Sequence, residues 1–157
     1  MMTFREFLEK KAAEEHHLQR KQRREEWIAA VNRLLAQIDA WVAEADPQGV
    51  LSVIPFEIER VEPDLGVYRV PALRISLGDA AVEVRPLARN THGFIEARGE
   101  ASVPAEGRVD IVTGGRQYIL YRSLLGGRET WYALDDKFRS CPLDRAELEA
   151  ILQDLLS

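Results

Sequence analysis

The chain has 157 residues, of which 46% are hydrophobic and 30% are charged, and its formal net charge is −5. A chain of this length has the size of one domain and can bury about two-thirds of its unfolded surface, so a core can form without metals or crosslinks. The acidic balance disfavours a protein that coats nucleic acid, and no run reaches the roughly 18 apolar residues of a membrane-spanning helix. Cys141 is the only cysteine and the first residues lack a signal-peptide apolar stretch, so we expect a cytoplasmic protein without an internal disulfide.

Residues 3–45 are predicted to form one long helix, or two helices in tandem. Thr3 and Glu6 have the spacing of a capping box, and neither glycine nor proline occurs before Pro47. At 1.5 Å per residue such a helix is about 60 Å long, about twice the diameter of a small domain. Part of it must therefore project, fold back or meet another chain.

The two halves of this helix differ in polarity. Apolar residues recur at spacings of three and four in residues 27–45, which predicts a part that packs on the core. That stripe consists of Trp27, Val31, Leu34, Ile38, Trp41 and Ala45, widened by Ile28, Leu35 and Val42. Residues 1–26 are mostly polar and are expected to project, with a separate apolar patch at the far tip formed by Phe4, Phe7 and Leu8.

Residues 46–157 change to short alternating runs separated by turn residues, which predicts an antiparallel sheet. The predicted strands are 50–54, 56–62, 67–70, 72–77, 80–85, 94–98, 108–112, 116–122 and 129–134. Gly78-Asp79, Gly114-Gly115 and Gly126-Gly127 favour hairpin turns, so each strand is expected to pair with the next in a meander. Strand 116–122 is apolar on both faces, which favours a place in the centre of the sheet.

Prolines and a final helix complete the pattern. Proline cannot donate a ladder hydrogen bond, so the prolines are expected at strand starts, ends, edges or bulges, where they mark boundaries between runs. They are Pro55, Pro63, Pro71, Pro86 and Pro104. Asp144 and Glu147 repeat the capping-box spacing before a short amphipathic helix. We therefore predict an α+β fold in which a long N-terminal helix precedes an antiparallel meander and a short C-terminal helix packs on the sheet. Residues 27–45 and 46–157 are expected to form one domain.

No catalytic motif is present. The sequence lacks the signatures of nucleophilic, zinc and phosphate-loop chemistry, so no catalytic residue, metal ion or cofactor is predicted. A pocket between sheet and helices could be built only from His92, Tyr121, Trp131 and Cys141. Each has a commoner interpretation: His92 as an exposed turn residue, Tyr121 and Trp131 as packing aromatics, and Cys141 as a half-buried thiol.

The densest charge cluster consists of Arg20, Lys21, Arg23 and Arg24, four positive charges in five residues. On a helix these side chains spread around the circumference as a basic collar. The collar could attract a phosphate backbone or an acidic protein, but Glu14, Glu15, Glu25 and Glu26 flank it and dilute its field. A solvated helix surface is the commoner interpretation.

Three functional hypotheses follow. The first is a non-enzymatic protein-interaction or assembly module, in which the projecting helix docks a protein partner or a second copy of the chain. The second is a small-ligand-binding or enzymatic domain with a pocket between sheet and helices. The third, disfavoured by the net charge, is nucleic-acid binding through the collar at residues 20–24. No membrane partner is expected, because no apolar face accompanies the collar.

Overall fold

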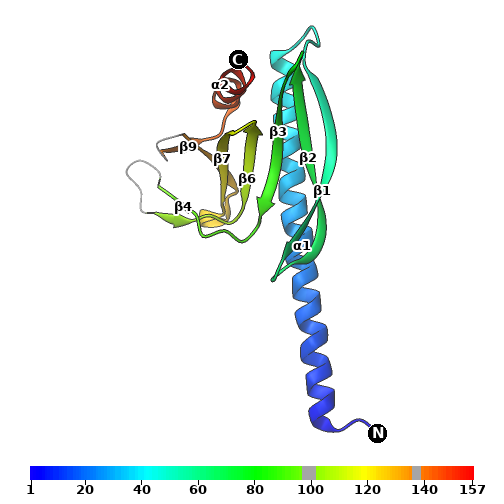
Figure 1. Ribbon diagram of the computed structural model, residues 1–157. Helices are drawn as coiled ribbons and strands as arrows, with labels where there is room; N and C mark the ends of the chain where they lie inside the picture. Colours follow the sequence, from blue (N-terminus) through cyan, green and yellow to red (C-terminus); the bar gives the residue numbers. More distant parts are fainter. Residues whose placement is uncertain (97–101, 136–138) are drawn as a thin grey trace.

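The computed structural model describes residues 1–96, 102–135 and 139–157. Its elements in chain order are α1 (Phe4–Ala45), β1 (Ser52–Glu62), β2 (Gly66–Leu77), β3 (Ala80–Ala88), β4 (Phe94–Ile95), β5 (Val103–Pro104), β6 (Arg108–Thr113), β7 (Arg116–Ser123), the 3-10 turn η1 (Leu125–Gly127), β8 (Thr130–Leu134), β9 (Ser140–Pro142) and α2 (Arg145–Leu156). Figure 1 shows the sheet against the C-terminal part of α1, whose N-terminal part extends well below the domain. The predicted α+β fold is confirmed.

Helix α1 is a single helix of 42 residues. At its start the Glu6 N–H donates to Thr3 Oγ1 and the Thr3 N–H donates to the Glu6 carboxylate, which completes the predicted capping box. At its end the Asp46 carboxylate accepts the N–H groups of Val50 and Leu51, both at 2.8 Å. These contacts turn the chain away from the helix and into β1.

One side of α1 is buried on the sheet. Its buried residues are Trp27, Ala30, Val31, Leu34, Leu35, Ile38 and Val42. Most of the predicted stripe is therefore confirmed, whereas Ile28 and Trp41 are half-buried and Ala45 is exposed. The last turn of the helix borders an open cleft, described below.

The main sheet has seven antiparallel strands in the order β1-β2-β3-β6-β7-β8-β9. Strands that are successive along the chain are neighbours in space, apart from the small β4–β5 hairpin inserted between β3 and β6, so the predicted meander is confirmed. Two-residue turns join Leu77 to Ala80 and Thr113 to Arg116. Gly78 and Gly114 open these turns with φ values of 58° and 53°, which glycine adopts without steric cost.

The strand boundaries expected at two prolines are wrong. Strand β1 runs through Pro55 and strand β2 runs through Pro71, so each unites two predicted strands. Pro55 is tolerated because β1 is an edge strand, and at Pro71 β2 has only β1 as a neighbour, since pairing with β3 begins at Leu73. Pro86 lies at a register shift in β3, as expected for a bulge.

Two further differences concern short strands. Strands β5 and β9 were not predicted, because two or three residues carry no alternating pattern. Of the predicted strand 94–98, Phe94 and Ile95 form β4, and its last two residues lie outside the described residues.

The sheet is covered on both faces around β7, which is an interior strand next to the middle strand β6. The main core lies between the sheet, α1 and α2, and a smaller cluster of Ile95, Ala105, Tyr121 and Leu134 lies beneath the β4–β5 hairpin. Two cores explain why β7 is apolar on both faces. Helix α2 begins where the Glu147 N–H donates to Asp144 at 2.8 Å, and it buries Leu148, Ile151, Leu152 and Leu155 as predicted.

Candidate functional site

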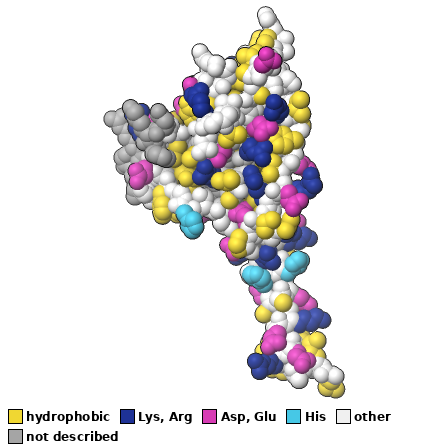
Figure 2. Space-filling model, viewed as in Figure 1, with side chains coloured by type: hydrophobic (Ala, Val, Ile, Leu, Met, Phe, Trp, Pro, Cys, Tyr) yellow, Lys and Arg dark blue, Asp and Glu magenta, His cyan; other side chains and the backbone are white. Residues whose placement is uncertain are grey.

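The N-terminal part of α1 stands clear of the domain, and every residue from Met1 to Gln19 is exposed. We call its helical residues, 4–19, the shaft. Figure 2 shows the shaft below the domain with no other segment beside it in this view. Contacts with the domain begin at the half-buried Arg20, inside the range 1–26 that the sequence assigned to the projecting part.

Local interactions keep the shaft helical without packing. Besides the capping box, Arg5 pairs with Glu9 at 3.3 Å and Lys11 with Glu14 at 3.5 Å. Each such pair adds only about 0.2–0.5 kcal/mol, but the shaft continues a helix that is already nucleated on the sheet. It can therefore extend without forming a costly nucleus of its own.

Apolar side chains gather at the tip of the shaft. Phe4 is 74%, Phe7 43% and Leu8 50% exposed, and we call these three residues the tip patch. The rings of Phe4 and Phe7 stack with centroids 6.3 Å apart, and the Lys11 ammonium lies 5.8 Å from the Phe7 ring. The tip patch is therefore a preformed, exposed apolar surface.

The basic collar is not a free patch. Arg24 Nη1 donates to the Leu65 carbonyl oxygen at 3.0 Å. The Arg20 guanidinium packs on the β1–β2 turn, where it lies 3.3 Å from the place that a Cβ on Gly66 would take. Two of the four collar residues thus hold the helix on the sheet, whereas Lys21 is exposed and Arg23 half-buried. The arrangement gives little support to phosphate binding.

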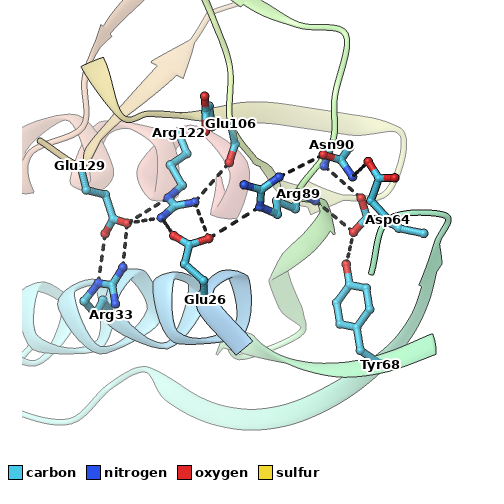
Figure 3. Close-up of polar contacts among 10 residues, drawn as sticks. Glu26, Arg33, Asp64, Tyr68, Arg89, Asn90, Glu106, Arg122 and Glu129 are labelled. Atoms are coloured by element: carbon cyan, nitrogen blue, oxygen red, sulfur yellow. Dashed lines mark hydrogen bonds and ion pairs between the residues drawn. The ribbon is translucent and has the colours of Figure 1, made fainter. Parts of the chain in front are cut away.

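An ion-pair network lies where the shaft joins the domain (Figure 3). Its centre is Arg122 on β7, whose side chain is only 1% exposed. Arg122 pairs with Glu26 on α1, donates to Glu129 at 2.9 Å and donates to the Glu106 carbonyl oxygen at 3.4 Å. Arg33 on α1 binds the same Glu129 through two hydrogen bonds of 3.2 and 2.8 Å. Partial burial acts to raise the pKa of Glu129, but the hydrogen bonds from Arg33 and Arg122 outweigh it and lower the pKa.

A second arm of the network holds the end of β1. Arg89 lies 3.6 Å from Glu26, and the N–H groups of Arg89 and Asn90 donate to the buried Glu62 at 3.1 and 3.0 Å. The Tyr68 hydroxyl also donates to Glu62. Burial, followed by the hydrogen bond to this carboxylate, raises the pKa of Tyr68. The carboxylates of Glu26, Glu62 and Glu129 and the Tyr68 hydroxyl are all engaged by neighbouring groups, so the network serves to position α1.

Sequence reasoning missed this network, although one signal was present. Arg122 shares its strand face with Leu120 of the main core, and a charged residue at an inward position demands a buried partner. From the sequence pattern, Glu26 is only one of the acidic residues that flank the collar.

The four residues nominated for a pocket do not meet. Tyr121 belongs to the smaller cluster and Trp131 to the main core, where its ring lies 6.2 Å from Trp27, so these two aromatics lie on opposite faces of the sheet. His92 precedes Gly93, whose Cβ position would lie 2.2 Å from Tyr121 Cζ, and the His92 turn therefore packs near Tyr121.

His92 and Cys141 occupy separate environments. His92 borders a polar hollow of about 300 Å³ that is lined by Arg89, Asn90, Thr91, Ala105 and Glu106. Cys141 lies in β9, where it pairs with Ala133 of β8. Burial, together with the nearby Glu147, raises the pKa of the Cys141 thiol to about 11. The thiol is thus protonated at neutral pH and is a poor nucleophile.

An apolar cleft opens between the last turn of α1, the end of β2 and α2. Its volume is about 290 Å³. The apolar residues of its wall are Trp41, Val42, Ala45, Leu51, Leu77, Leu148, Leu152 and Leu156. None of the four nominated pocket residues lines it, and its few polar neighbours are Glu149, Gln153 and Ser157.

Several site types find no support within residues 1–96, 102–135 and 139–157. No group of three or more histidine, cysteine, aspartate or glutamate residues there is placed to hold a metal ion, and no helix there is long and apolar enough to cross a membrane. Comparison of the chain with protein-family models, with curated proteins and with solved structures finds no match in any of the three.

Proposed function

We propose that this chain is a non-enzymatic protein-interaction module of the cytoplasm, with the shaft and its tip patch as the binding surface. The observation that carries the proposal is that every residue from 1 to 19 is exposed, including the three large apolar side chains of the tip patch. Burial of one such side chain in a partner is worth about 1.5–3 kcal/mol, so the tip patch can contribute strongly to an interface. The proposed cytoplasmic location rests on Cys141, the single cysteine of the sequence, because a lone thiol fits a reducing compartment.

The contacts that fix α1 on the sheet next to the shaft support the same proposal. The Arg122 network and the collar contacts hold α1 on the sheet at the point where the shaft departs. A surface held in one orientation loses less conformational entropy on binding than a flexible one. The helix is therefore presented to a partner in a prepared state.

The test compares the complexes that three proteins form in cell extract. Circular-dichroism melting first shows that each of the three has a folded domain. The first is the full chain, the second begins at Arg20 and so retains the collar contacts, and the third carries Phe7→Glu and Leu8→Glu. Crosslinked complexes should form with the full chain and be lost with the other two. Ala13→Glu is the matched control and should retain them, because Ala13 is exposed on the shaft but lies about 7.5 Å beyond Leu8 along the helix and outside the tip patch. Equal complexes from all proteins would refute the proposal.

A second candidate is the binding of a small apolar molecule in the cleft between α1, β2 and α2. Its almost wholly apolar wall favours this function over an enzymatic one, because binding sites are concave and mostly apolar whereas catalysis needs convergent polar groups. An environment-sensitive apolar dye should bind the full chain, and Ala45→Trp at the rim of the cleft should displace it. If the dye binds both proteins equally, the cleft is not its site.

A further inference from the structure

The side of α1 that faces away from the sheet carries a second pattern. Leu18 lies nine residues before the buried Trp27, half a revolution around the helix at about 100° per residue. Phe4 and Lys11 precede Leu18 at seven-residue intervals and share its face, since a heptad drifts by only about 20°. All three are exposed, Phe4 by 74% and Leu18 by 52%. The outward face of the shaft is therefore a row of large side chains.

The same face changes character beside the domain. Ala29, Ala36 and Ala43 follow one another at heptad spacing, and all three are exposed. Small side chains allow another helix to approach closely, provided that the opposing residues are large enough to fill the space. The outward face of α1 thus has large residues at one end and small residues at the other.

These two sets are mirror images about the Arg23–Arg24 peptide bond. Phe4 mirrors Ala43, Lys11 mirrors Ala36, and Leu18 mirrors Ala29. A second copy of α1 laid antiparallel, with its centre at the same point, would place each large side chain opposite a small one. The match repeats on both sides of the two-fold axis, as an isologous interface requires.

Charged residues between these layers are complementary in the same alignment. Lys11 comes within one helical turn of both Asp39 and Arg33 of the second copy. That Arg33 is already paired with Glu129 of its own chain and also comes beside Glu15, which leaves Asp39 as the partner of Lys11. Lys11 is 60% and Arg33 57% exposed at the side chain, so both remain accessible to a second chain. Polar pairs at defined layers specify register and orientation in helix pairs.

From this self-complementarity we infer that two copies of the chain associate through antiparallel pairing of their α1 helices along the outward face. The inference rests on the proposed function and names a second copy as the partner. The two domains then lie at opposite ends and on opposite sides of the helix pair, so they do not collide. A contact strip about 10 Å wide and 60 Å long buries about 1,200 Å² in total, the lower end for a specific interface.

The first experiment is a charge exchange followed by sedimentation equilibrium. Lys11→Glu should weaken the dimer by about tenfold, because two ion pairs become two repulsions, and Asp39→Lys should do the same. The double variant should recover the affinity. Lys11 and Asp39 of one chain are about 42 Å apart along the helix, so recovery can arise only between chains. Double-variant affinity as low as that of the single variants would overturn the pairing.

The second experiment tests orientation by disulfide formation in a Cys141→Ser background. Leu18→Cys and Ala29→Cys chains are oxidised separately and as a mixture, at concentrations where the wild-type chain is a dimer. Antiparallel pairing predicts a crosslinked dimer only in the mixture. Crosslinking within either single variant would show parallel helices and overturn the inference.

A chain that remains monomeric at millimolar concentration would also overturn self-association. The proposed function would survive that result if shaft-dependent complexes with other proteins still formed in extract, and it would fall if they did not. The two failures are therefore distinguishable.

Discussion

Arg122 on β7 and Glu26 on α1 form an ion pair across 96 residues of sequence, and the Arg122 side chain is only 1% exposed. Glu26 lies one residue before Trp27, the first large side chain of the packed half of α1. The Arg122 guanidinium also lies 5.9 Å from the Trp27 ring. The pair thus anchors the helix at the point where it leaves the sheet, and it is the first target for mutation.

Replacing Glu26 by glutamine should destabilise the fold by about 1–3 kcal/mol, because a buried guanidinium loses one of its two carboxylates. Glu129 retains its contact with Arg122, which keeps the loss below that of a wholly unpaired charge. Urea unfolding followed by circular dichroism measures the difference. Glu25→Gln, on the adjacent exposed residue, should change the stability by less than about 0.5 kcal/mol, and equal losses in both variants would show that the pair has no structural weight.

The pH dependence of stability should include a contribution from Glu129. Its pKa in the folded chain is lowered, since the hydrogen bonds from Arg33 and Arg122 outweigh the effect of burial. A lowered folded-state pKa gives stability that is present above the unfolded pKa of about 4.3 and is lost as the pH falls through the folded pKa. Glu129→Gln should therefore lose less stability than the wild-type chain as the pH falls from 7 to below the unfolded pKa of about 4.3. Parallel curves in urea unfolding would contradict this assignment.

Gly107→Ala should destabilise the domain by about 1–3 kcal/mol. A Cβ at Gly107 would lie 2.3 Å from Trp27 Cζ3, and Trp27 is fully buried and cannot move aside. The φ of 151° at Gly107 adds backbone strain for any other residue. Gly115→Ala is the control, because nothing lies within 4 Å of its Cβ position, and its melting temperature should stay near that of the wild-type chain. Similar melting temperatures for the two variants would show that the close approach is not as tight as described.

The packed stripe of α1 can be tested at Ile38, which is fully buried in the main core. Ile38→Ala should lower the stability by about 2–5 kcal/mol, because a cavity replaces the side chain. Ala40→Ser, two residues away on the exposed side, should have little effect. A normal melting temperature for Ile38→Ala would mean that the helix is only loosely held by the sheet.

Much of the architecture could be predicted from short-range patterns. The capping box at Thr3 and Glu6, the hairpin turns at Gly78 and Gly114, and the cap at Asp144 are each built from residues a few positions apart, and all three appear as expected. The proline boundaries failed for the opposite reason. Whether Pro71 interrupts a strand depends on which neighbour its backbone meets, and that neighbour is chosen by the whole sheet.

The candidate surface shows the same division. Exposure of the tip patch followed from the loss of apolar periodicity in residues 9–26, which a single chain segment displays. The contacts of Arg20 and Arg24 with the β1–β2 turn could not be predicted in this way, because the residues near Arg20 and Arg24 in sequence do not indicate which distant segment packs against them. The pocket nominations joined residues such as Tyr121 and Trp131, which strand alternation and pairing put on opposite faces.

The sequence by itself determined a long capped helix with one packed half, a meander of hairpins and a short amphipathic helix, because periodicity, caps and turns arise from interactions within a few residues. Only the tertiary structure decided that Arg122 is buried against Glu26, that the collar arginines serve as contacts with the sheet, and that two cores cover β7. Those features depend on how the sheet lies on the helix, and an ion pair or a core forms only after distant segments have been brought into register.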